Sequence, residues 1–88
     1  PFSFGIQRAF PNPTNGPVKL VFGVDVDTRV SLKIYDLSGR LAETLVNGDM
    51  KAGYHQVTWN TNLTSSGLYL VRLEAQSRNH ITKVTVLK

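Results

Sequence analysis

The sequence contains no cysteine, which excludes disulfide bonds, thiolate metal ligands and cysteine nucleophiles together. The missing cysteines leave the compartment open, because disulfide-free domains also occur outside the cell. No apolar run approaches the roughly 20 residues that a membrane-spanning helix needs, and the chain does not open with a charged segment followed by an apolar one. We therefore expect no membrane insertion, and we assign any amino-terminal export signal to a longer parent protein.

Histidine is scarce, and the two that occur do not have the spacing of a metal site. No H-x-H or E-x-x-H pattern joins His55 to His80. His55 alternates in phase with Val57 and Trp59, which is typical of a structural histidine. The serines lie outside any G-x-S-x-G motif, so no catalytic triad can be assigned. We expect no catalytic residue, no metal site and no cofactor.

The composition predicts one folded domain of modest size. The 88 residues are 41% hydrophobic and 18% charged, which is typical of a globular chain with room for a single core. Because the chain starts at Pro1 and not at methionine, we expect residues 1–88 to be a piece of a longer protein. The net charge of +4 comes from lysines and arginines that are never adjacent, so the sequence does not favour nucleic-acid binding.

Apolar side chains recur at every second residue along almost the whole chain, which is the period of a half-buried strand. Segments rich in Gly, Asn, Asp and Ser separate these runs and are typical of turns. The pattern predicts seven strands, near residues 6–9, 18–24, 30–35, 41–46, 55–60, 69–74 and 83–88. Since no segment is long enough for a crossover helix, we predict an all-β fold, a seven-stranded antiparallel immunoglobulin-like β-sandwich. The predicted core consists of Leu20, Phe22, Leu32, Ile34, Val57, Trp59, Tyr69, Val71, Leu73, Val84 and Val86.

Two turn motifs have a direct physical interpretation. Pro11 and Pro13 in PNP fix the backbone φ angle and exclude a helix, which predicts a rigid corner between the first two strands. In YDLSGR, Asp36 can accept hydrogen bonds from the residues that follow, and Gly39 can take a positive φ. This second motif therefore predicts a hairpin turn.

Two further patterns resemble ligand or modification sites. Asp25 and Asp27 have the spacing of two calcium ligands, but the later Asp or Asn, the Gly and the distal Glu of a calcium loop are missing. The triplet at residues 62–64, Asn-Leu-Thr, matches the N-glycosylation pattern, which arises often by chance. Neither pattern is strong enough to predict a site.

Trp59, Tyr54 and Tyr69 are the residues that could form a flat aromatic platform for a sugar. Trp59 is in phase with the apolar positions of its strand, which favours a place in the core. A carbohydrate-binding or spacer module of a secreted glycosidase nevertheless stays open as an alternative function, and it would need aromatic side chains exposed in a row.

Five segments occur in an order that resembles a known protein family. They are AFPNPTNGPVKLVFGV (9–24), VSLKIYDLSGRLAETLV (30–46), AGYHQVTWNT (52–61), LTSSGLYLVRLEA (63–75) and KVTVLK (83–88). Together they resemble the type A C-terminal sorting domain of the type IX secretion system. The immunoglobulin-like domain of flagellar hook-capping proteins shares much of this pattern, so a hook-capping type of assembly domain is a second alternative.

The resemblance implies a non-catalytic C-terminal signal domain. Such a domain directs a fused amino-terminal cargo through the periplasm and across the outer membrane to the cell surface or the medium. The implied partners are the outer-membrane type IX translocon and a surface sortase-like peptidase that anchors or cleaves the cargo; the oligomeric state stays open. By match to the family, the residues implied in translocon recognition are Gly67, Tyr69, Lys83, Val84, Val86 and Lys88. We further hypothesise that a partner recognises either the terminal lysine pair, Lys83 and Lys88, or the last strand as a free sheet edge to which it adds a strand.

Overall fold

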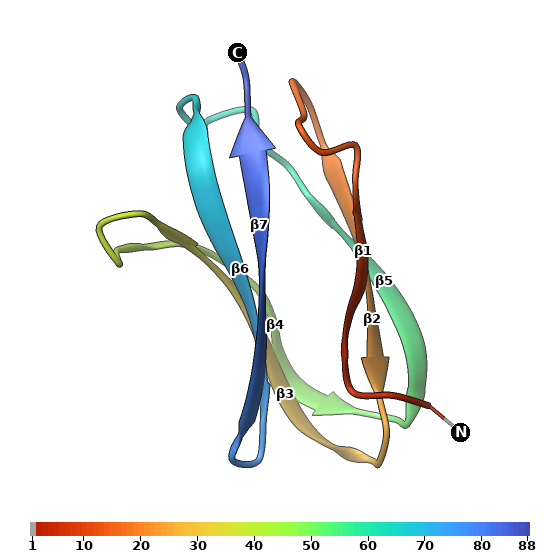
Figure 1. Cartoon of the computed structure of the whole chain (residues 1–88). Helices are drawn as coiled ribbons and strands as arrows, with labels where there is room; N and C mark the ends of the chain where they lie inside the picture. The colour runs from red at the N-terminus through yellow and green to blue at the C-terminus, as the bar shows by residue number, and fades with distance from the viewer. Residues whose placement is uncertain (1) are drawn as a thin grey trace.

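Alternating apolar and polar residues form seven strands in the computed structural model, which describes residues 2–88. The strands are β1 (Gly5–Phe10), β2 (Val18–Val24), β3 (Thr28–Asp36), β4 (Leu41–Met50), β5 (Gly53–Trp59), β6 (Gly67–Ala75) and β7 (Arg78–Val86). They form a three-stranded sheet in the order β1-β2-β5 and a four-stranded sheet in the order β4-β3-β6-β7 (Figure 1). All strand pairs are antiparallel. The predicted all-β sandwich is confirmed, and none of the described residues lies in a helix that could span a membrane.

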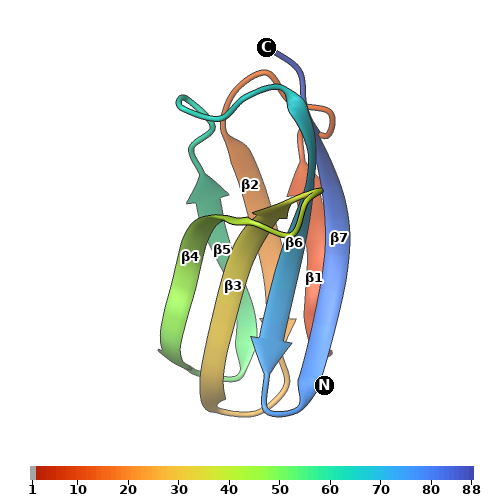
Figure 2. The same cartoon turned by 90° about the vertical axis from the view of Figure 1, so that its left-hand side faces the viewer.

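Several strands are longer than the sequence pattern predicted. β4 continues to Met50. β7 already begins at Arg78, because the turn between β6 and β7 is only two residues long. Gln76 in this turn has a φ of 57°, the left-handed conformation that tight hairpins use. β4 and β7 are the two edges of the four-stranded sheet (Figure 2). Edge strands expose many side chains to water, so the apolar alternation that marks strand ends is weak there.

The core lies between the two sheets and contains the predicted residues, with one correction. Val57 packs against the core but is only half-buried, on β5 at the edge of the smaller sheet. Trp59 is 1% exposed, and the edge of its ring packs against Tyr69 with 5.5 Å between the ring centroids. Four small apolar residues join the predicted ones in the core, namely Val18, Val24, Val30 and Ala75. Each large apolar side chain buried in this way contributes about 1.5–3 kcal/mol before chain entropy is subtracted.

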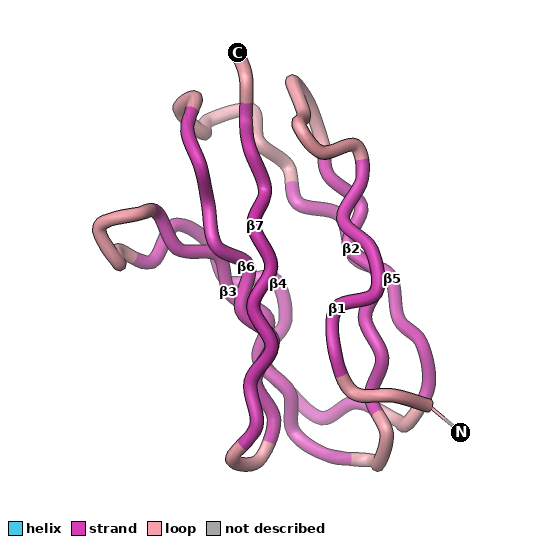
Figure 3. Tube along the Cα trace, in the orientation of Figure 1, coloured by secondary structure: helices cyan, strands magenta, loops and turns pink. Residues whose placement is uncertain are grey.

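The YDLSGR segment forms the predicted hairpin between β3 and β4. One carboxylate oxygen of Asp36 accepts hydrogen bonds from the backbone N–H groups of Ser38 and Arg40, both at 3.0 Å, and from the Ser38 hydroxyl at 2.6 Å. Gly39 has a φ of 89°, which favours glycine. The hairpin projects away from the sandwich (Figure 3). Its motif is therefore explained by local turn geometry.

Two of the outer edges are irregular. The pairing of β1 with β2 shifts between Ile6 and Arg8. The pairing of β4 with β3 shifts twice, next to Leu32 and next to Ile34. Such bulges bend an edge strand and interrupt the row of groups that another chain could pair with. β1 and β4 are therefore poor templates for strand addition.

Candidate functional site

The structure brings together four of the six residues that the family resemblance implied. Gly67 pairs with Val86 and Tyr69 pairs with Val84, so these residues form two cross-strand pairs of β6 and β7, with the pair Leu68 and Thr85 between them. Lys83 is the next residue along β7 and pairs with Leu70. Lys88 lies just beyond the end of β7.

The same six residues divide sharply by burial. Val84 and Val86 are fully buried, and Tyr69 is 8% exposed, with its hydroxyl donating to the Ser65 carbonyl oxygen at 2.8 Å. The other three residues, Gly67, Lys83 and Lys88, are exposed. A partner that binds the folded domain can therefore contact only the exposed three, whereas the buried three shape the strand pair from inside.

Lys88 is held by the loop between β5 and β6. Its ammonium group donates hydrogen bonds to the backbone carbonyl oxygens of Thr61 and of Asn62, the second at 3.3 Å. Its backbone N–H donates to the Ser66 hydroxyl oxygen at 2.8 Å. This ammonium group therefore fixes the segment after β7, a role that residue spacing does not reveal.

The outer edge of β7 is covered near its end by two residues of the PNPT segment, Asn12 and Thr14, which we call the edge latch. The Asn12 side chain donates to the Lys83 carbonyl oxygen at 2.9 Å and accepts from the Thr85 N–H at 3.0 Å. The Thr14 N–H donates to the Thr85 carbonyl oxygen at 2.9 Å, and the Leu87 N–H donates to the Thr14 carbonyl oxygen at 2.7 Å. The amide of Asn12 thus replaces a neighbouring strand.

The edge latch corrects the hypothesis of a free last strand. From Lys83 to Leu87, the latch occupies backbone groups on the side of β7 that faces away from β6. Strand addition there requires the latch to leave first. Near the start of β7, the His80 ring nitrogen Nδ1 accepts the Ile6 N–H at 2.9 Å, which ties β1 to the same edge.

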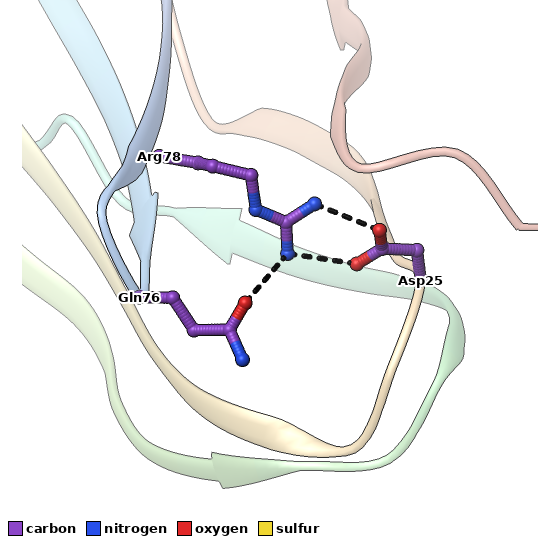
Figure 4. A network of polar contacts seen from close by, with 3 residues as sticks. All are labelled: Asp25, Gln76 and Arg78. Atoms are coloured by element: carbon purple, nitrogen blue, oxygen red, sulfur yellow. Dashed lines mark hydrogen bonds and ion pairs between the residues drawn. The ribbon is translucent and has the colours of Figure 1, made fainter.

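Asp25 and Asp27, the residues with calcium-like spacing, have separate partners. The guanidinium of Arg78 donates two hydrogen bonds to Asp25, at 2.7 and 2.9 Å, and a longer one to Gln76 at 3.4 Å (Figure 4). Arg78 also lies over the Phe4 ring, 4.3 Å from its centroid. Asp27 accepts the Ala52 N–H at 2.8 Å. The observed arrangement is an ion pair that fastens the β2–β3 loop to the β6–β7 hairpin.

Three aspartates have pKa values below the ordinary range, so the stability of the fold should depend on pH under acidic conditions. The Arg78 hydrogen bond lowers the pKa of Asp25, the Ala52 N–H lowers the pKa of Asp27 and the Ser38 hydroxyl lowers the pKa of Asp36. A carboxylate with a depressed pKa in the folded state stabilises the protein above its unfolded pKa and loses this contribution as the pH falls through its folded pKa.

We therefore expect a melting temperature that changes little from pH 7 to about pH 5 and falls steadily below about pH 4. In an Asp25→Asn variant the fall should be shallower, since one of the three carboxylates no longer titrates. Thermal unfolding followed by circular dichroism between pH 7 and pH 2 measures both profiles. A melting temperature that stays constant down to pH 2 would contradict the lowered pKa values of Asp25, Asp27 and Asp36.

The histidines and the aromatic platform have structural explanations. The His55 ring stacks on Phe22 with 5.5 Å between centroids, and its Nε2 atom lies 2.7 Å from the Lys51 carbonyl oxygen. In residues 2–88 no three His, Asp or Glu side chains gather as a metal site would require. Trp59 and Tyr69 are buried, while Tyr54 is 55% exposed. The three rings therefore do not form one exposed row, and the sugar-platform interpretation is wrong for Trp59.

The comparison with known families gives one match. Residues 8–87 match the family described as secretion system C-terminal sorting domain. Neither the curated proteins nor the solved structures include a match to this chain.

Proposed function

Because the chain belongs to the family of secretion system C-terminal sorting domains, we propose that residues 1–88 act as one C-terminal module of a larger secreted protein. The domain is a sorting signal of type IX secretion, and its cargo is exported through the periplasm to the cell surface or the extracellular space. The family is in general non-catalytic, and we extend this to the present chain. The family match carries the proposal.

The partners that we propose are the outer-membrane translocon, which binds the folded domain, and a sortase-like peptidase at the cell surface, which releases or anchors the cargo. Gly67, Lys83 and Lys88 are the exposed members of the set implied in recognition. Lys83 is the strongest candidate for direct contact, because its side chain has no described hydrogen-bond partner, whereas Lys88 binds two backbone carbonyls. Tyr69, Val84 and Val86 act by keeping β6 and β7 in register.

A fusion experiment tests the sorting function. We expect that the 88 residues, placed after an unrelated periplasmic reporter in a host with type IX machinery, carry the reporter to the surface or the medium. Protease accessibility of the reporter on intact cells measures delivery. If the mass of the delivered reporter is lower than that of the full fusion by the mass of the domain, the domain has been cleaved off. If a fusion with a folded domain stays in the periplasm, the sorting function is wrong and a spacer or hook-assembly role takes its place.

Neutralising Lys83 and Lys88 tests whether they contribute to recognition independently of their contribution to folding. We expect a Lys83→Gln, Lys88→Gln fusion to remain folded yet accumulate in the periplasm. Exposed substitutions such as Lys83→Gln usually change the free energy of unfolding by less than about 0.5 kcal/mol. Loss of the Lys88 hydrogen bonds adds about 1 kcal/mol. Lys19→Gln, on the other sheet, is the matched control, and normal delivery of the double variant would exclude the lysines from recognition.

A further inference from the structure

The outer face of the four-stranded sheet carries a continuous apolar row. Leu41, Tyr35 and Leu70 are successive cross-strand neighbours on β4, β3 and β6, and Lys83 on β7 continues the row. Cross-strand neighbours point to the same face of a sheet and lie about 5 Å apart. Leu41 is 48% exposed, so the row begins in solvent.

The next row on the same face contains two cations directly opposite each other. Lys33 on β3 pairs with Arg72 on β6, and Arg72 in turn pairs with Ile81 on β7, which is 51% exposed. Like charges in directly opposed positions destabilise a sheet. Arg72 has one carboxylate partner, Glu74 at 3.2 Å, and its buried Nε atom has no hydrogen-bond partner among the described residues. The isolated domain therefore carries a local excess of positive charge beside an apolar row.

We call this surface the cationic face and define it by its apolar and its charged members. They are Tyr35, Leu41, Leu70, Ile81, Lys33, Arg72 and Lys83, together with Glu74, the one anion of this set, which forms an ion pair with Arg72. The outer face of the three-stranded sheet differs. There Lys19 pairs with Phe10 and with Thr58, and Arg8 lies over the Phe10 ring at 4.3 Å. That face has no directly opposed cations in its register.

Other routes to the last strand are closed in the folded domain. The edge latch covers the outer edge of β7 from Lys83 to Leu87, β1 is tied to this edge at His80, and Val84 and Val86 are buried. Lys83 is the exposed residue of β7 that belongs to the set implied in recognition, and it lies on the cationic face. A partner that binds β7 of the folded domain therefore contacts the cationic face.

We propose that the cationic face docks on a protein of the secretion machinery whose contact surface is apolar at its centre and carries carboxylates at its rim. This inference rests on the sorting function proposed above. An apolar centre with an aromatic ring and arginine is typical of protein interfaces, and a partner carboxylate placed between Lys33 and Arg72 would relieve their repulsion. An anionic lipid or polysaccharide could satisfy the cations, but it leaves the apolar row from Leu41 to Leu70 without a matching surface.

The substitution Lys33→Glu tests the proposal because it has opposite expected effects on stability and on delivery. In the isolated chain it replaces a repulsive pair with an attractive one, so we expect a higher melting temperature. In the reporter fusion, Lys33→Glu alone should lower delivery to the surface by about tenfold, the change that about 1.4 kcal/mol of lost binding produces. The control Lys19→Glu should leave delivery within about twofold. Normal delivery of Lys33→Glu, with the parent fusion delivered, would overturn the cationic face and leave the sorting function intact.

Site-specific photocrosslinking identifies the class of partner. A photoreactive amino acid at position 81, on the cationic face, should form an adduct with a protein of the translocon during export of the fusion. The same amino acid at position 54, which is 55% exposed on the other sheet, should not. Adducts of equal yield from both positions, or adducts only with lipopolysaccharide from position 81, would contradict the proposal. A parent fusion that is not delivered at all would instead contradict the sorting function itself.

Discussion

Replacing Trp59 with alanine should lower the free energy of unfolding by about 3–5 kcal/mol, the largest effect that we expect of any single substitution. The indole is 1% exposed and packs edge-on against Tyr69, which lies in the opposite sheet. Its removal leaves a cavity between the sheets that backbone shifts can fill only in part. Because domains of this size have about 5–15 kcal/mol of stability in total, the variant should be close to unfolded at physiological temperature. Urea denaturation measures this loss of unfolding free energy, followed by far-UV circular dichroism, because the backbone signal does not depend on the tryptophan that is removed.

The matched control is Tyr54→Ala, on the same strand. Tyr54 is 55% exposed and contacts Phe2 edge-on, so its loss should cost less than about 1 kcal/mol. A loss below about 1 kcal/mol for Trp59→Ala as well would place the indole on the surface. The aromatic-platform interpretation would then have to be considered again.

The second large effect is expected at the edge latch. Asn12→Ala removes two hydrogen bonds to the backbone of β7, which corresponds to about 1–3 kcal/mol in the free energy of unfolding. The Lys83 carbonyl and the Thr85 N–H would then face solvent, where they are available to another strand. We therefore also expect the variant to self-associate with rising concentration. Sedimentation velocity, together with urea denaturation, measures both effects.

Asn15→Ala is the control for the latch variant. Asn15 is exposed in the same segment, and its side chain makes no described hydrogen bond. Its replacement should leave both the stability and the monomer fraction as in the parent chain. If Asn12→Ala behaves like Asn15→Ala, the latch does not protect the edge of β7.

Local patterns were sufficient to predict the strands and most of the core, because a half-buried strand places apolar side chains at every second residue. Asp36 and Gly39 were also predicted correctly, since their turn involves only neighbouring residues. Val57 has the phase of a core residue and packs against the core, but it is only half-buried, and its phase does not distinguish it from the fully covered Trp59 on the same strand. Alternation shows which face a side chain occupies, but not how well that face is covered.

Two contacts that the sequence did not reveal join distant parts of the chain. Arg78 meets Asp25 across 53 positions, and Lys33 meets Arg72 only through the pairing of β3 with β6. Each of these side chains alone would be interpreted as a solvated charge. The family pattern likewise marks Val84 and Val86 without distinguishing residues that pack from residues that a partner contacts. That distinction requires the burial seen in the folded domain.

The edge latch also has a consequence for timing. Asn12 is separated by 71 positions from Lys83 and by 73 from Thr85, so closing this contact brings together two ends of the chain. Contacts across such long separations form late in folding, since the entropy of the intervening loop must be overcome first. During synthesis, Asn12 lacks its two partners until Lys83 and Thr85 have left the ribosome. A polypeptide interrupted before Thr85 therefore lacks the hydrogen bonds of Asn12 and Thr14 to Thr85, and the end of its last strand stays uncovered.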